Sequence, residues 1–191
     1  MKPIRLATFI LFASLCGVTF AQSHAHDSAD KAPPTEAQKA FEKLKTVAGS
    51  WVGQVTTVPD AGMNGTMTQL SLRVTSRGNA LAHEISVSGS PDHPLTMFYV
   101  DGDRLVLTHY CDAGNRPRMT GKLSPDGKTI EFDFLDLSGS NQQGHMDHAV
   151  FTFIDANHHI EEWTYMMPGD KPMHARLDLQ RTNIGNSSYG F

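Results

Sequence analysis

From Trp51 towards the C-terminus, hydrophobic and polar residues alternate in short runs that predict a β-protein. In residues 70–74 (LSLRV) and 130–134 (IEFDF), an apolar side chain occupies every second position. A period of two places alternate side chains on opposite faces of a strand. The pattern predicts strands at 51–58, 65–76, 80–88, 95–100, 104–111, 116–123, 129–136, 147–154, 159–167 and 173–182.

Short turn sequences between these runs predict how the strands are connected. The turns include Asp101-Gly102, Ser124-Pro125-Asp126-Gly127 and Asp155-Ala156-Asn157, which contain the residues that tight turns favour. Connections this short force antiparallel neighbours. A meander of this many strands usually closes, because closure removes exposed edges. The predicted fold is therefore all-β, an antiparallel meander β-barrel of about ten strands, with a two-sheet sandwich as the alternative.

A short helix is predicted immediately before the first strand. Thr35 can cap its start, and Gln38 follows three residues later, as in a capping box. Apolar residues then recur at helical spacing, at Phe41, Leu44 and Val47, before Gly49 ends the helix. We expect this helix to pack across one end of the barrel.

The N-terminus has the pattern of a cleavable secretory signal. Lys2 and Arg5 precede an apolar stretch at 6–20, and Thr19-Phe20-Ala21 offers a cleavage site after Ala21. The stretch is too short for a stable membrane span. We therefore expect a secreted or periplasmic protein, with a signal peptide at 1–21, a disordered lead-in at 22–34, the barrel domain at 35–182 and a flexible tail at 183–191.

The net charge and the cysteine content of the chain limit the classes of function and the means of stabilisation. The chain has 16 basic and 20 acidic residues; loss of Lys2 and Arg5 leaves 14 basic residues and a net charge of −6. A chain with this net negative charge lacks the excess of basic residues that is typical of a nucleic-acid-binding protein. Cleavage also removes Cys16 and leaves Cys111 without a partner for an internal disulfide. The core must therefore hold the barrel together.

The chain resembles the calycin superfamily, which comprises lipocalins, fatty-acid-binding proteins and nitrobindin-like proteins, and it is most similar to bacterial lipocalin-like domains. The resemblance rests on Gly49-Ser50-Trp51-Val52-Gly53 after Leu44, on the meander, and on a final strand ending Leu177-Asp178-Leu179-Gln180-Arg181. It implies that a basic residue of the last strand packs on Trp51, with Arg181 as the candidate and Arg176 as the second. Nitrobindin-like proteins hold haem through a histidine near the C-terminal end, and His174 is the only histidine near that position.

Several side chains are candidates for lining a ligand cavity. His109 and Cys111 share a face with Leu105 and Leu107, and His83 lies among apolar residues of another strand, so these groups are expected to point inward. They would be polar anchors in an apolar cavity or ordinary core residues. The full set of predicted ligand-binding residues is His83, Met97, Tyr99, His109, Cys111, Arg118, Trp163 and Tyr165.

Two carboxylates lie beside the last two of these residues. Glu161 shares a face with Trp163 and Tyr165, whereas Glu162 faces the other way. Adjacent strand residues point apart and cannot act on one atom, so an acid–base pair is disfavoured. We expect one exposed glutamate and one paired with an arginine such as Arg118.

Metal binding is a further hypothesis. His145 and His148 have opposite parity on a strand, so a bend near Gly144 would be needed to bring them together, and His109 with Cys111 would add nitrogen and sulfur ligands. After cleavage, His24 at the third position would suit Cu(II) or Ni(II).

These observations favour a binding protein over an enzyme. No nucleophile motif, phosphate-binding loop or dinucleotide fingerprint is present in the sequence. The leading hypothesis is an exported barrel that binds a small, largely apolar ligand. The alternatives are a metal- or haem-binding barrel and a hydrolase or isomerase that uses His109 and Cys111.

Overall fold

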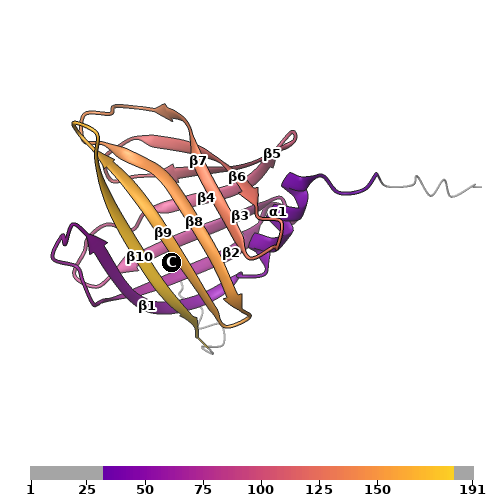
Figure 1. Cartoon of the computed structure of the whole chain (residues 1–191), viewed down its shortest axis with the longest axis horizontal. Coiled ribbons are helices and arrows are strands. Elements are labelled where there is room, and N and C mark those ends of the chain that lie inside the picture. Colours follow the sequence, from indigo (N-terminus) through magenta and orange to yellow (C-terminus); the bar gives the residue numbers. More distant parts are fainter. Residues whose placement is uncertain (1–31, 183–191) are drawn as a thin grey trace, which may run out of the picture. The chain divides into compact units, whose positions relative to one another are not determined.

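The computed structural model describes residues 32–182, which form one α-helix, one 3₁₀ turn and a closed ten-stranded barrel (Figure 1). The elements are α1 (Glu36–Lys45), β1 (Gly49–Val58), β2 (Thr66–Thr75), η1 (Ser76–Gly78), β3 (Ala80–Val87), β4 (Leu95–Asp101), β5 (Arg104–Tyr110), β6 (Arg116–Leu123), β7 (Thr129–Ser138), β8 (His145–Asp155), β9 (His158–Met167) and β10 (Lys171–Arg181). The predicted fold class is confirmed. No strand end differs by more than two residues from its predicted position.

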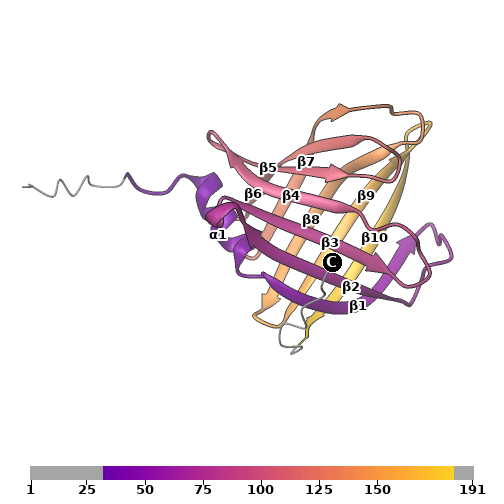
Figure 2. The same cartoon turned by 180° about the vertical axis from the view of Figure 1, so that it is seen from behind.

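The barrel is a continuous antiparallel meander. Each strand pairs with the next along the chain, and β1 pairs with β10 to close the sheet, with Trp51 opposite Arg181. Figure 2 shows β1 beside both β2 and β10 from the reverse side. Closure leaves no unpaired strand edge in the sheet, which explains how so many short strands coexist without an aggregation-prone border.

The helix α1 covers one end of the barrel, where β4, β5 and β6 contact it (Figure 1). Thr35 caps α1 through its side chain, and the side chain of Gln38 accepts a hydrogen bond from the backbone N–H of Thr35, so the predicted capping box is confirmed. The inner face of α1 buries Phe41 and Leu44 against the barrel. Loops β1–β2, β3–β4, β5–β6, β7–β8 and β9–β10 lie at the opposite end, which we call the open end.

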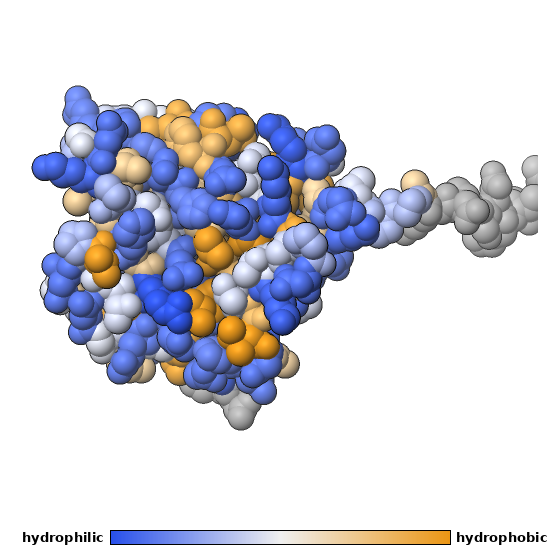
Figure 3. All heavy atoms as spheres, viewed as in Figure 1, coloured by the Kyte–Doolittle hydropathy of each residue, from blue (hydrophilic) through white to orange (hydrophobic). Residues whose placement is uncertain are grey.

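The interior near α1 is filled by a hydrophobic core. Fully buried aromatic side chains meet there, with the rings of Phe98, Phe132 and Phe151 within 5.8 Å of one another, centroid to centroid. On the face shown in Figure 3, hydrophilic side chains predominate and apolar residues form smaller patches between them. The alternation seen in the sequence therefore separates an apolar lumen from a polar outer face.

Several expectations concern residues outside the described range. The signal peptide, the lead-in up to residue 31, the tail at 183–191 and the proposed metal ligand His24 all lie outside residues 32–182. Within that range, no helix is long and apolar enough to span a bilayer.

Candidate functional site

Trp51 and Arg181 close the helix end of the barrel. The indole N–H of Trp51 donates to the carbonyl oxygen of Val47 at 2.9 Å, and the guanidinium of Arg181 lies 4.2 Å from the indole centroid. Arg181 also donates to the carbonyl oxygens of Ala48, Thr46 and Ala156 at 2.7–3.1 Å. The contact expected from the calycin resemblance is therefore present, and it joins the first strand, the last strand and the end of α1.

Gly49 makes this arrangement possible. Its φ of +139° lies in a region that L side chains rarely adopt, and a Cβ there would collide with the guanidinium of Arg181. Any other residue at this position would strain the turn from α1 into β1 and displace the guanidinium of Arg181.

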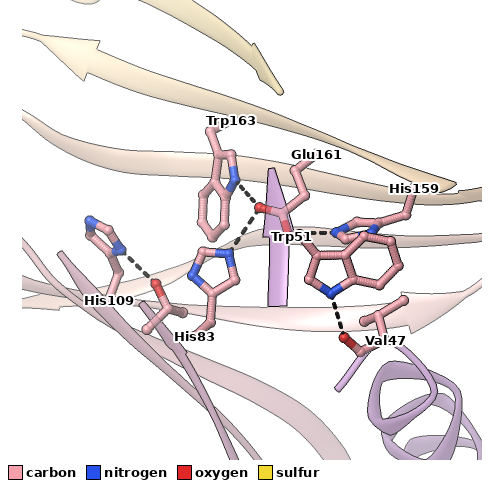
Figure 4. Close-up of polar contacts among 8 residues, drawn as sticks. Val47, Trp51, His83, His109, His159, Glu161 and Trp163 are labelled. Atoms are coloured by element: carbon pink, nitrogen blue, oxygen red, sulfur yellow. Dashed lines mark hydrogen bonds and ion pairs between the residues drawn. The ribbon is translucent and has the colours of Figure 1, made fainter. Parts of the chain in front are cut away.

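A buried carboxylate, Glu161, organises the middle of the lumen (Figure 4). Its Oε2 lies 2.9 Å from Nε2 of His83 and 3.0 Å from Nε1 of Trp163, and its Oε1 lies 3.1 Å from Nε2 of His159. The side chain of Glu161 is 0% exposed. Three nitrogens thus converge on one carboxylate, which is how proteins compensate a buried charge.

The network holds Glu161 in its ionised form. Burial alone would raise the pKa of Glu161, but electrostatic attraction to the His83 ring and the hydrogen bonds from His159 and His83 together outweigh burial and hold the pKa well below its usual range. An ionised carboxylate only accepts hydrogen bonds, so Nε2 of both histidines carries a proton. This assignment leaves Nδ1 of each ring free, and neither Nδ1 has a hydrogen-bond partner among residues 32–182.

His109 lies in the same lumen, below the loops of the open end, and its ring faces Trp163. Its Nδ1 is 2.8 Å from Oγ1 of Thr96, and its ring centroid is 5.9 Å from that of Trp163. Burial, and then the electrostatic effect of the neighbouring His83, lower the pKa of His109 to about 4, against an opposing effect of the Asp112 charge. His109 is therefore a neutral group at pH 7.

Above these residues, a cavity of about 460 Å³ extends to the open end. Apolar and aromatic side chains make up most of its wall, and its inner end is formed by His83, His109 and Trp163 (Figure 4), with Thr96 beside His109. The open-end loops supply the remainder, including Ser90 and Asp92 from β3–β4 and Asp112 and Ala113 from β5–β6. A concave, mainly apolar space with a few convergent polar groups is typical of a small-molecule site.

The structure brings five of the predicted ligand-binding residues to this cavity: His83, His109, Cys111, Trp163 and Tyr165. The other three, Met97, Tyr99 and Arg118, are not among its lining residues. Tyr99 bonds to Thr108 and Arg118 to Asp136. Parity explains this placement, because Phe98 and Met119 point inward, so their neighbours along the strand point outward.

The expectation for the glutamates needs correction. Glu162 is exposed and pairs with Arg176, but Glu161 pairs with histidines and not with an arginine, and Arg118 pairs with Asp136 instead. The sequence analysis also did not single out His159, which contacts Glu161, or Thr96, which contacts His109. The available signal was parity, since His159, Glu161 and Trp163 occupy alternate positions of one strand.

The predicted metal ligands do not form one cluster. His109 and Cys111 line the cavity, His145 bonds to Asn141 beside the ring of Phe134, and His148 pairs with Glu131 and Asp133. A bulge between Met146 and His148 is present, but it does not bring the two histidines of β8 to one site. Within residues 32–182, the one group with metal-like spacing is Glu131, Asp133 and His148, and these residues already form ion pairs.

The position implied for a haem ligand does not fit haem in this barrel. His174 is exposed on β10, and its Nδ1 lies 3.1 Å from Oγ1 of Thr164 on the neighbouring strand. Its side chain is therefore not directed at the cavity, which His174 does not line.

The thiol of Cys111 is not activated. Burial raises its pKa to about 11, and the hydrogen bond and charge of Asp112 act in the same direction, against the opposing hydrogen bond from the backbone of Ala113. The thiolate is the nucleophile in cysteine chemistry, so the raised pKa argues against a hydrolase or isomerase built on this residue.

We accordingly expect slow alkylation of Cys111. At pH 8 its reaction with iodoacetamide should be on the order of 100-fold slower than that of a free thiol with a pKa of about 8.5. The rate should keep rising as the pH approaches about 11, because the thiolate forms only there. A reaction rate that levels off below pH 8 in the folded protein would contradict the raised pKa of Cys111. The urea-unfolded protein, in which the thiol is exposed, is the control.

Comparisons with known proteins support the fold and leave the family open. No family model and no curated protein matches the chain. Among solved structures, a protein of unknown function of the DUF3598 family from Nostoc punctiforme is similar, with a TM-score of 0.54 and 14% identity over 73% of this chain and 48% of that chain. The present chain thus spans about half the length of that protein.

A second similar structure is Rv2717c from M. tuberculosis. Its TM-score is 0.54 and its identity is 16%, over 75% of this chain and 97% of that chain. At these identities the likeness concerns the fold alone. It agrees with the barrel fold described above.

Proposed function

We propose that the protein is an exported barrel that binds a small, largely apolar molecule in its cavity. The observation that carries the proposal is the cavity of about 460 Å³, which remains beside an otherwise close-packed core. Protein interiors normally contain few voids larger than a water molecule. The side chains that surround this space would bury the apolar surface of a ligand, and export rests on the signal pattern of residues 1–21.

The binding mechanism is burial of apolar ligand area, with the inner histidines fixing orientation. At about 25 cal/mol per Å² of apolar area removed from water, a ligand that buries roughly 300 Å² gains on the order of 7 kcal/mol before the cost of immobilisation. Met63, Met146 and Met173 line the wall. Such flexible, polarisable side chains adapt to ligands of different shape.

Narrowing the cavity should weaken binding without unfolding the barrel. Ala175 lines the cavity on β10, and Ala175→Phe places a ring inside it. We expect Nile red, an uncharged apolar dye, to bind about tenfold more weakly, which corresponds to losing roughly 60 Å² of ligand burial. The measurement is a fluorescence titration of the purified protein.

The matched control is Ala156→Phe, which adds the same ring to the exposed turn between β8 and β9 at the helix end. It should leave the dye affinity unchanged. Equal affinities for the wild type and both variants, or no uptake of Nile red by the wild type, would count against the cavity as the binding site. Protein from its own host should begin at Gln22 in an intact mass spectrum if export is correct.

A further inference from the structure

The Nδ1 atom of His83 is a buried polar atom with no hydrogen-bond partner in residues 32–182. The His83 side chain is 2% exposed, and its other nitrogen is committed to Glu161 at 2.9 Å. Figure 4 shows the free nitrogen on the side of the ring that faces His109, and both residues line the cavity. Leaving such an atom unpaired costs about 1–3 kcal/mol. A ligand atom in the cavity is the partner that would remove this cost.

The hydrogen bonds of Glu161 determine whether the ligand atom that pairs with Nδ1 must donate or accept a hydrogen bond. Because the carboxylate is ionised and only accepts, Nε2 of His83 donates its proton to Glu161. When the His83 ring carries a single proton, that proton is on Nε2 and Nδ1 is an acceptor. The ligand group that fits it is a hydrogen-bond donor.

The charges around the cavity favour a cation over a neutral donor. Glu161 lies behind His83, and the ion pairs recorded for it within the described residues are with His83 and His159. Asp92 and Asp112 line the cavity at its open end, whereas none of the lining residues is a lysine or an arginine. Burial, and next the charge of Asp112, raise the pKa of Asp92. The lining thus has carboxylates without a basic side chain to balance them, which gives the cavity a negative potential.

Trp163 adds a surface suited to a cation at the inner end. Its ring centroid lies 5.7 Å from that of His83 and 5.9 Å from that of His109, so the indole is close to both imidazoles. The indole N–H donates to Glu161, which leaves the ring face as the part that can contact a ligand. A cation near an indole face is attracted to the ring quadrupole.

We propose that the ligand is an amphiphilic amine, whose protonated amino group donates to Nδ1 of His83 beside Trp163 while its apolar part extends towards the open end. This inference rests on the proposed function, and adds to it the sign of the ligand's charge and the position of its head group. Asp92 and Asp112 attract the cation to the open end, and the buried charge of Glu161 favours it at the inner end.

Three probes with the same tail test the proposal. Decylamine, decanol and decanoate are each used to displace Nile red at pH 7, below the concentrations at which they form micelles. Decylamine, which is protonated at this pH, should bind roughly tenfold more tightly than decanol, as expected for one charge-assisted hydrogen bond. Decanoate should bind most weakly, because its charge has the same sign as the cavity.

The outcomes separate the two proposals. If decanoate or decanol binds as tightly as decylamine, the proposal of an amine ligand is overturned. The proposal that the cavity binds an apolar ligand then still stands. If Nile red binds and none of the three probes displaces it, the amine proposal also fails while the cavity remains a binding site. If Nile red itself does not bind, the proposed function fails first.

Two sets of variants locate the head group. His83→Leu should weaken decylamine roughly tenfold and leave decanol unchanged, since only the amine uses Nδ1 strongly; equal losses for both probes would indicate a structural role and overturn the assignment. A variant carrying both Asp92→Asn and Asp112→Asn should slow the association of decylamine and reduce its salt dependence. Asp103→Asn, an exposed carboxylate in the β4–β5 turn at the helix end, is the matched control. Identical association rates for all three proteins would remove the role of the open-end carboxylates.

Discussion

Replacing Glu161 by glutamine is expected to lower the free energy of unfolding by about 3–5 kcal/mol, as is usual when one partner of a buried charge network is removed. Glutamine preserves the shape, but its uncharged amide places an NH₂ where three N–H groups now converge. At least one donor is then left buried without an acceptor. Urea denaturation followed by tryptophan fluorescence measures the change.

Glu162→Gln is the matched control for this variant. Glu162 is the next residue along β9, but it is exposed and pairs with Arg176 at the surface. Its replacement should change the free energy of unfolding by about 0–1 kcal/mol. If the two variants were equally stable, the buried network would contribute nothing beyond packing.

The same network predicts how stability depends on pH. The pKa of Glu161 is lower in the folded protein than its ordinary value of 4.5, because His83 and His159 outweigh the effect of burial. Its contribution is therefore fully present above the unfolded pKa and is lost as the pH falls towards the folded pKa. Between pH 5 and pH 3 the wild type should lose more stability than Glu161→Gln, whose amide does not titrate.

Replacing Arg181 by alanine is expected to destabilise the barrel by about 2–3 kcal/mol. The change removes hydrogen bonds to the carbonyl oxygens of Thr46, Ala48 and Ala156, and it removes the cation from the face of Trp51. These contacts join β10 to the end of α1 and to the start of β1. Their loss should loosen the helix end of the barrel and lower the midpoint of urea denaturation.

Arg176→Ala tests whether the loss of stability depends on the position of the arginine or only on its charge. Arg176 lies on the same strand and carries the same charge, but its partners are the exposed carboxylates Glu162 and Asp178. Surface pairs of this kind contribute about 0–1 kcal/mol. A loss of stability as large for Arg176→Ala as for Arg181→Ala would show that the closure of the barrel does not depend on the contact with Trp51.

The sequence predicted the strands well because strand formation in this chain is a local property. In residues 70–74 and 130–134 every second residue is apolar; Leu70, Leu72, Ile130 and Phe132 are buried in the lumen, whereas the last apolar residue of each run, Val74 and Phe134, is exposed. Tight turns such as Asp101-Gly102 then determine which strands pair. Where the local pattern is ambiguous, as in the nearly continuous apolar run 95–100, the prediction placed Met97 and Tyr99 on the wrong side of the cavity wall.

By itself, then, the sequence determined the order of the elements, their boundaries and the side of the barrel wall to which most side chains point. Only the tertiary structure decided which inward-pointing groups meet. His83 on β3 and Glu161 on β9 are 78 residues apart and their strands are not neighbours in the sheet, so they meet across the lumen. Parity specifies a face and turns specify adjacent strands, but contacts across the lumen depend on the closure, twist and packing of the whole barrel. That is why Glu161, the buried charge at the centre of the site, was recognised only in the folded structure.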